Sequence, residues 1–178
     1  MKKVHFIGIG GIGISAIARF LKERDFIISG SDIADSAITK ELRASGMKIT
    51  VPHCKTAIED PDFVVYSAAI KGDNVELLEA RKRGIECLSR KEALPFILEG
   101  KRVFAVAGAH GKSTTSAMLA SLMEGSAIIG AISKEFGSNM KYEASDNLIF
   151  EADESDSSFL NSNPFLAIVT NAEPEHME

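Results

Sequence analysis

The chain of 178 residues is 45% apolar and 25% charged, a composition typical of a globular protein with one or two domains. Its net charge of −5 offers no basic surface, so nucleic acid is excluded as an expected partner. The two cysteines, Cys54 and Cys87, lack the C-x-x-C spacing of a zinc site, which favours reduced thiols in a cytoplasmic protein. Four glycines interrupt the apolar stretch 4–18, so we expect neither a signal peptide nor a segment in the membrane.

Short apolar runs and amphipathic helices alternate along the first hundred residues. Residues 4–9 have the continuous apolar character of a buried parallel strand, and the following helix places Ile14, Ile17, Ala18 and Leu21 on one face. Repeated β-α units predict right-handed crossovers and a parallel sheet covered on both faces. The further expected elements are a strand at 26–29, a helix at 36–45 capped by Gly46, a strand at 63–67, a helix at 75–83 ended by Gly84, a strand at 85–88, and a helix opened by a capping box at 89–92.

The same alternation restarts near residue 100. A strand is predicted at 103–107, a turn at 108–112 and a helix at 113–124, with three more strands at 127–129, 148–150 and 165–169. We therefore predict two domains, 1–100 and 101–178. The second would end directly after a strand and leave a parallel sheet with an exposed edge, so we expect the natural protein to continue beyond residue 178.

The first motif is G-x-G-x-x-G between the first strand and the first helix. Its glycines permit a tight turn, let a diphosphate approach the backbone, and let helix and strand pack closely, while the helix N-terminus offers N–H groups to phosphate. Asp32 ends the second strand, where an acidic side chain can bind a ribose hydroxyl. The motif is compatible with NAD and with other nucleotide diphosphates, and also with a glycine-rich turn that has no ligand. Its residues are Gly8, Gly10, Gly11, Ile12, Gly13 and Asp32.

The second motif is a phosphate-binding loop between the strand at 103–107 and the helix that follows. Such a loop needs backbone N–H groups, a lysine for the β- and γ-phosphates of ATP, and a hydroxyl for Mg²⁺. Val106 stands where the usual spacing would place the first glycine, so this loop is a variant. The residues expected to bind ATP are Gly108, Ala109, His110, Gly111, Lys112, Ser113 and Thr114.

Two further polar segments follow strands expected at the same end of the sheet. The acidic run 151–156 begins with Glu151, whose carboxylate could reach Mg²⁺ held by the neighbouring loop, although acidic runs are often solvated loops. The segment 171–176 ends in His176, which would be an exposed residue in the simplest interpretation. Ligands of open α/β sheets bind at this end of the strands, which favours a functional role for both segments.

Taken in order, these segments resemble the Mur ligases, enzymes that build the peptide of bacterial cell-wall precursors. The similarity lies in stretches 5–15, 29–32, 67–70, 107–115, 151–160 and 169–178, which together span nearly the whole chain. Family members usually have Thr at the positions of Ala109 and Ser113, and Asp at those of Glu175 and Glu178. Serine keeps the hydroxyl and glutamate keeps the charge, so these departures affect only fine geometry.

The resemblance implies a three-domain cytoplasmic enzyme whose first domain is Rossmann-like and whose second is a P-loop α/β ATP-binding domain. It implies that ATP phosphorylates the lactyl carboxylate of UDP-N-acetylmuramate and that L-alanine attacks the acyl phosphate. Lys112, Glu151 and His176 would be catalytic, with Mg²⁺ held by Ser113, Glu151 and His176. The sugar nucleotide would bind at the first glycine motif, Asp32, Ser67 and Ala68.

Three alternatives remain open. A related ligase that recycles murein tripeptide shares the motifs but resembles the chain less in its first glycine loop and in the acidic run. An NAD-dependent oxidoreductase would account for the first glycine loop but not for the lysine-bearing loop. A non-catalytic nucleotide-binding module is the third, because the amino-acid site is implied to lie in a C-terminal domain, and we expect these 178 residues by themselves not to ligate.

Overall fold

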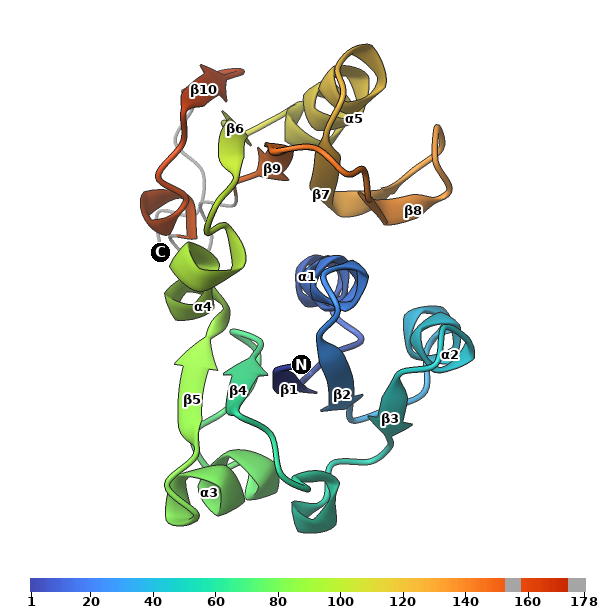
Figure 1. Cartoon of the computed structure of the whole chain (residues 1–178), viewed down its shortest axis with the longest axis vertical. Helices are drawn as coiled ribbons and strands as arrows, with labels where there is room; N and C mark the ends of the chain where they lie inside the picture. The colour runs from blue at the N-terminus through green and yellow to red at the C-terminus, as the bar shows by residue number, and fades with distance from the viewer. Residues whose placement is uncertain (153–157, 173–178) are drawn as a thin grey trace. The chain divides into compact units, whose positions relative to one another are not determined.

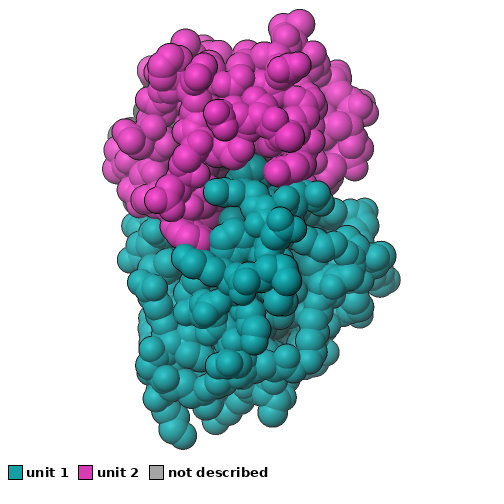
Figure 2. Space-filling view, viewed as in Figure 1, with its two compact units in different colours: residues 1–93 teal, residues 94–178 magenta. Residues whose placement is uncertain are grey.

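The computed structural model describes residues 1–152 and 158–172, and they form two compact units, Met1–Ala93 and Leu94–Glu178 (Figure 2). The division falls inside helix α4 (Arg90–Ile97), a few residues before the change of domain that the sequence predicts. Within the described ranges, no helix combines the length and the apolar character needed to cross a membrane.

The first unit is a five-stranded, fully parallel sheet with the strand order β3-β2-β1-β4-β5 (Figure 1). Strand β1 (Lys3–Ile7) lies at the centre of this sheet, and its residues from Val4 to Ile7 are therefore all buried. Along the chain follow α1 (Ile12–Glu23), β2 (Ile27–Ser31), α2 (Ala37–Ala44), β3 (Lys48–Thr50), the 3-10 helix η1 (Lys55–Ala57), β4 (Phe63–Tyr66), α3 (Val75–Lys82), β5 (Glu86–Ser89) and α4.

Polar capping residues precede α2 and α4, and glycines follow α2 and α3. Helix α2 begins at a complete capping box formed by Ser36 and Thr39, and the predicted box of Ser89 and Glu92 precedes α4. Gly46 and Gly84 follow α2 and α3 with φ angles of +89° and +71°, left-handed conformations that favour glycine. The predicted helix ends are therefore confirmed at these positions.

Strand β3 is an element that the sequence analysis missed. It is three residues long and pairs only with the end of β2, from Ser29 to Ser31. A strand of that length contributes too few residues for an alternating or continuous apolar pattern to emerge.

The second unit has a five-stranded sheet with the order β10-β6-β9-β7-β8. Its elements are β6 (Arg102–Ala107), α5 (Lys112–Leu122), β7 (Ser126–Ser133), β8 (Ser138–Lys141), β9 (Asn147–Glu151), the 3-10 helix η2 (Ser158–Asn161) and β10 (Leu166–Val169). Strands β10, β6, β9 and β7 are parallel as predicted, and β7 and β8 form an antiparallel hairpin that the sequence did not predict. Strand β8 is polar, with the sequence SNMK, and gave no apolar signal.

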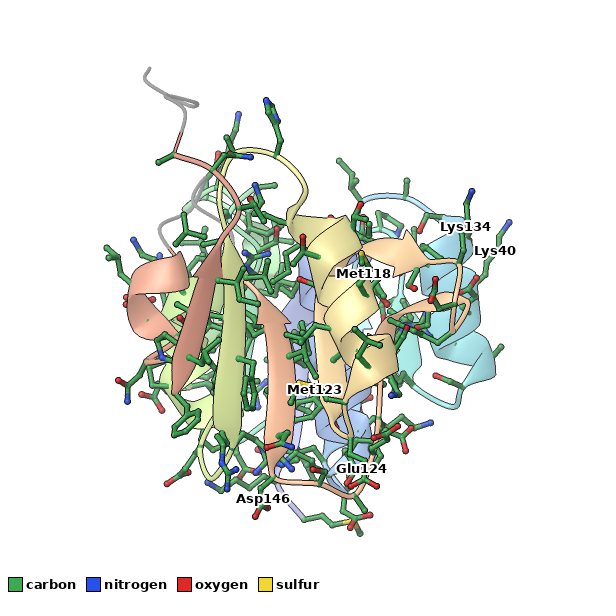
Figure 3. All side chains as sticks on the ribbon, turned by 90° about the horizontal axis from the view of Figure 1, so that it is seen from above. Lys40, Met118, Met123, Glu124, Lys134 and Asp146 are labelled. Carbon is green, nitrogen blue, oxygen red and sulfur yellow. The ribbon has the colours of Figure 1, made fainter. Side chains whose placement is uncertain are left out.

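Helix α5 covers one face of the second sheet. Ala120 packs in a cluster with Ala127 and Ile129 of β7 and Ile149 of β9, and Met123 closes it from the end of the helix. Figure 3 shows Met118 on α5 as well, and 59% of it is exposed, so the apolar surface of this helix is only partly covered. Glu124 and Asp146 precede strands β7 and β9, so they lie at the amino ends of these strands (Figure 3). The predicted motifs lie at the opposite, carboxyl ends.

Candidate functional site

A pocket of about 560 Å³ opens in the first unit at the ends of β1, β2 and β4. Gly8, Gly10, Gly11, Asp32 and Ser67 line it, as the sequence analysis predicts for a nucleotide diphosphate. Ile12, Gly13 and Ala68 are also predicted to bind the ligand, but they do not line this pocket. The lining further contains Ile33, Ala34, Ser36, His53, Ala69, Ile70, Lys71, Asp73 and Asn74.

The backbone amides of the glycine loop already have acceptors within the protein. The N–H groups of Gly8 and Ile9 donate to the carbonyl oxygen of Ser31 at 2.9 and 3.0 Å. Gly11 N–H donates to the Gly8 carbonyl at 3.2 Å, and Gly10 N–H donates to Asp32 Oδ2 at 2.7 Å. The N–H groups of residues 8–11 thus hold the loop in shape, and the positive end of the α1 dipole is the feature of this motif that favours phosphate.

Asp32 has a structural role that the sequence analysis did not foresee. Its Oδ2 accepts the N–H of Gly10, and its Oδ1 accepts the N–H of Ile33 at 2.8 Å. A Cβ atom on Gly10 would lie 2.8 Å from Oδ2, so this residue must be glycine for the carboxylate to hold the loop. Each carboxylate oxygen accepts more than one hydrogen bond, and the contact with a ribose hydroxyl stays a prediction.

The third glycine of the motif has a different neighbour from the one expected. A Cβ atom on Gly13 would collide with the guanidinium group of Arg90, rather than with a strand of the sheet. The close approach of backbone to strand occurs instead at Gly30 of β2, where a Cβ atom would lie 2.8 Å from the Phe6 carbonyl oxygen. Gly13 therefore makes room for a side chain, and Gly30 makes room for the sheet.

A buried polar network next to the pocket is the main feature that sequence reasoning missed. Glu76 of α3 is fully buried, and its Oε2 accepts hydrogen bonds from Ser31 Oγ at 2.6 Å and from His5 Nε2 at 3.0 Å. Its Oε1 accepts the N–H of Cys54 at 2.8 Å, and His53 Nδ1 lies 2.8 Å from Ser31 Oγ. No motif marks these residues, because they come from four separate elements and loops that only the fold brings together.

Glu76 is held in its ionised form. Burial by itself raises the pKa of this carboxyl group, but hydrogen bonds from His5, Ser31 and the Cys54 amide together outweigh burial, and the pKa of Glu76 lies below its ordinary value. Its position in the first turn of α3, where the helix dipole favours negative charge, acts in the same direction.

The second unit places the lysine-bearing loop between β6 and α5. Gly108 and Gly111 have φ angles of +126° and +81°, which fold residues 108–111 back over the start of the helix. Lys112 Nζ donates to the carbonyl oxygens of Gly108 and Ala109 at 2.7 and 3.1 Å. A small pocket of about 240 Å³ lies over the loop and is lined by residues 109–114.

Ser113 and Glu151 meet as the sequence predicts for a magnesium site. Ser113 Oγ donates to Glu151 Oε1 at 2.9 Å, and Glu151 Oε2 accepts the N–H of Gly130 at 2.8 Å. The contact arises because β6 and β9 are neighbours with Val106 opposite Glu151. A hydroxyl and a carboxylate oxygen are hard donors that fit Mg²⁺, which also takes phosphate oxygens of its nucleotide. His176, the third predicted ligand, lies outside the described residues.

The loop after β10 binds the backbone of the phosphate loop. Asn171 Oδ1 accepts the N–H of His110 at 3.1 Å, and its Nδ2 donates to the His110 carbonyl at 3.0 Å. Thr170 Oγ1 donates to the same carbonyl at 2.6 Å. The His110 backbone thus connects the phosphate loop to the segment after β10, a function that the sequence did not suggest.

Known proteins resemble the chain over its whole length. The Mur ligase family, catalytic domain, matches residues 3–102. A UDP-N-acetylmuramate–L-alanine ligase of Campylobacter curvus is 78% identical over the entire chain, which covers 41% of that relative.

Two solved structures share the fold. One is UDP-N-acetylmuramate–alanine ligase from Thermotoga maritima, which matches with a TM-score of 0.92 and 34% identity. The match covers 99% of this chain and 43% of the Thermotoga chain. The other is UDP-N-acetylmuramate:L-alanyl-gamma-D-glutamyl-meso-diaminopimelate ligase from Neisseria meningitides, which matches with a TM-score of 0.91 and 26% identity. The match covers 100% of this chain and 63% of the Neisseria chain. The predicted fold class is confirmed, and the chain spans about two fifths of the curated relative's length. It belongs to the Mur ligase family.

Proposed function

We propose that this chain carries the sugar-nucleotide and ATP-phosphate sites of a ligase that joins L-alanine to the lactyl carboxylate of UDP-N-acetylmuramate. The observation that carries the proposal is the presence, in one chain, of a glycine-loop pocket and a Lys112–Ser113–Glu151 cluster on two separate sheets. The 78% identity to an L-alanine ligase supports the choice of substrates. A cytoplasmic location follows from the same proposal, because ATP and nucleotide sugars are cytoplasmic substrates.

The first unit would bind UDP-N-acetylmuramate. Its pocket of about 560 Å³ is of the size that small-molecule ligands occupy, and it contains the glycine loop, Asp32 and Ser67. The diphosphate would lie at the N-terminus of α1, where the helix dipole favours negative charge. Asp32 keeps the loop in position for it through the bond to Gly10.

The second unit would hold the phosphates of ATP. Lys112 would exchange the carbonyl oxygens of Gly108 and Ala109 for the β- and γ-phosphate oxygens, which carry full negative charge. Ser113 and Glu151 would hold Mg²⁺, with His176 as a further predicted ligand. The positive charge of the metal ion would offset the negative charge of the phosphate oxygens during transfer of the γ-phosphoryl group to the lactyl carboxylate. The alanine amine then attacks the acyl phosphate and releases phosphate.

The tripeptide-recycling ligase is the second candidate, because the Neisseria structure has nearly the same TM-score as the Thermotoga structure. Identity favours L-alanine as the substrate. The two candidates share the proposed sites in this chain and differ in the amine that they accept. A comparison of L-alanine with the tripeptide as acceptor would decide between them.

The proposal is tested by Lys112→Ala in the complete ligase, with Lys40→Ala as a control. Lys40 is an exposed lysine of α2 in the first unit (Figure 3). We expect Lys112→Ala to lower alanine-dependent phosphate release roughly 10²–10³-fold, because a charge that stabilises the transition state is lost. UDP-N-acetylmuramate binding, measured by calorimetry, should not change, and the control should retain its rate. An unchanged rate in Lys112→Ala at saturating ATP would contradict the proposal.

A further inference from the structure

The side chain of Asn171 holds the backbone of His110 through both of its polar groups. Asn171 Oδ1 accepts the His110 N–H at 3.1 Å, and Asn171 Nδ2 donates to the His110 carbonyl oxygen at 3.0 Å. A side-chain amide carries a donor and an acceptor side by side, so it pairs with a backbone residue much as a neighbouring strand does. The two residues are 61 positions apart, and the pairing of β10 with β6 brings them together.

Thr170 adds to the same contact. Its Oγ1 donates to the His110 carbonyl oxygen at 2.6 Å, and its N–H donates to the Ala107 carbonyl oxygen at 3.0 Å. A Cβ atom on Gly108 would lie 2.9 Å from the carbonyl oxygen and 3.0 Å from the nitrogen of Asn171, so the loop and this segment are in direct contact. Residues 170–171 therefore hold the phosphate loop at two points, Gly108 and His110.

This contact fixes the direction of the two peptide groups that flank His110. In a trans peptide the N–H and the C=O point in opposite directions, and both of these peptide bonds are trans. The His110 N–H points to Asn171, so the Ala109 carbonyl oxygen points away from it. That oxygen accepts a hydrogen bond from Lys112 Nζ at 3.1 Å. The His110 carbonyl also points to Asn171, so the Gly111 N–H likewise points to the opposite side of the loop.

An anion fits on that opposite side. The pocket of about 240 Å³ over the loop is lined by residues 109–114 and not by residues 170–171. Helix α5 begins here, and its N-cap, Gly111, has no side chain to cap it. The positive end of the helix dipole therefore favours phosphate at this position. Gly111 is also the residue with the widest choice of backbone conformations, so its N–H keeps one direction only if another group holds the loop.

We propose that Asn171 is a positioning residue for the ATP phosphates, which it serves by holding the His110 backbone so that the Gly111 N–H faces them. This inference rests on the proposed function, because it places ATP at this loop. Without the Asn171 amide, the peptide group between His110 and Gly111 rotates more freely. The charge-assisted hydrogen bond from this N–H to a phosphate oxygen then forms only after the loop has been ordered again, which lowers the affinity for ATP.

The experiment compares Asn171→Ala with Asn147→Ala in the complete ligase. Asn147 is the matched control, because its Nδ2 also donates to a backbone carbonyl of the second unit, that of Glu124, at 3.0 Å. That contact lies at the amino end of β9, away from the phosphate loop. Calorimetry measures the affinity for Mg-ATP, alanine-dependent phosphate release gives KM and kcat, and urea unfolding measures stability. Selective nitrogen-15 labelling of glycine follows the Gly111 amide resonance during titration with Mg-ADP.

We expect Asn171→Ala to bind Mg-ATP roughly 10–100-fold more weakly, the loss of a hydrogen bond to a charged group, with a parallel rise in the KM for ATP. At saturating ATP the bound phosphates order the loop, so kcat should change little. The Gly111 resonance should shift less on addition of Mg-ADP in this variant than in the wild type. Asn147→Ala should also lose stability, but it should keep the wild-type affinity, KM and Gly111 shift. A role of Asn171 in stability alone would make the two variants alike in all of these measurements.

Thr170→Val is a second test variant, because it removes one hydrogen bond to His110 and leaves the Asn171 amide in place. It should weaken Mg-ATP binding by roughly 2–10-fold, and it decides the question if urea unfolding shows that Asn171→Ala does not fold. Wild-type affinity for Mg-ATP in the folded variants, or an equal loss in Asn147→Ala, would overturn the inference and leave the proposed function intact. A wild-type rate in Lys112→Ala would overturn the proposed function and the inference together.

Discussion

Replacement of Gly10 by alanine tests how the first glycine loop is held. The new Cβ atom would lie 2.8 Å from Asp32 Oδ2 and 3.1 Å from Thr39 Cγ2, and Thr39 is fully buried. If the carboxylate stays, the overlap costs about 1–3 kcal/mol, and if it moves away, a charge-assisted hydrogen bond of about 1.5–3 kcal/mol is lost. Alanine also lowers the conformational entropy of the unfolded chain, which stabilises the folded state by about 0.4–1 kcal/mol. The net destabilisation should therefore be about 1–2 kcal/mol.

Urea unfolding of the 178-residue chain measures this cost, and Gly11→Ala is the control in the same loop. A Cβ atom on Gly11 would lie 3.3 Å from a methyl group of Ile14, and the backbone there has φ −64° and ψ 143°, which alanine readily adopts. The control should therefore change stability by less than about 0.5 kcal/mol. In an Asp32→Ala background the cost of Gly10→Ala should fall by about 1 kcal/mol or more, because the atom that it overlaps is gone. An equal cost in both backgrounds would refute the reasoning.

Three further substitutions have clear expected outcomes. Gly108→Ala should destabilise the chain by about 2–5 kcal/mol in urea unfolding, because φ at this residue is +126° and the new Cβ atom would overlap the backbone of Asn171. Gly111→Ala is the control, since Gly111 also has a positive φ, of +81°, but has open space around it. It should destabilise the chain by only about 1–2 kcal/mol. Glu76→Gln should destabilise the chain by about 2 kcal/mol at pH 7. Because the pKa of Glu76 is lowered by folding, its ionised form stabilises the protein above about pH 4.5 and loses this effect as the pH falls through the folded-state pKa. The stability difference between wild type and Glu76→Gln in urea unfolding should therefore narrow as the pH falls below about 4.5, and a constant difference would contradict the assignment.

The fold was largely predictable because the two periodic signals in the sequence are strong. Burial of Ile14, Ile17, Ala18 and Leu21 on α1 follows directly from their helical spacing. The hairpin of β7 and β8 was not predictable, since β8 is short and polar and its pairing depends on contacts across the sheet. Local sequence therefore identified the central strands and the edge strands β5 and β10, and failed for β3, which has three residues, and for the polar strand β8.

The contacts within the candidate sites were likewise predictable only in part. The contact between Ser113 and Glu151 could be predicted, because both follow from the rule that ligands gather at the carboxyl ends of parallel strands. The network of His5, His53 and Glu76 could not, because its members are separated by up to 71 residues and each is unremarkable in its own segment. The use of Asp32 to hold Gly10 depends on side-chain geometry, which sequence spacing does not determine.

The central position of β1 has a consequence for the order in which the chain can fold during synthesis. Val4 of β1 pairs with Phe63 of β4, so one edge of the central strand has no partner until some sixty further residues have been made. At a synthesis rate of about 5–20 residues per second, this edge stays uncovered for roughly 3–12 s. An apolar strand with an open edge is a template for pairing with other chains, so the start of this protein is exposed to such pairing while the chain is still being synthesised.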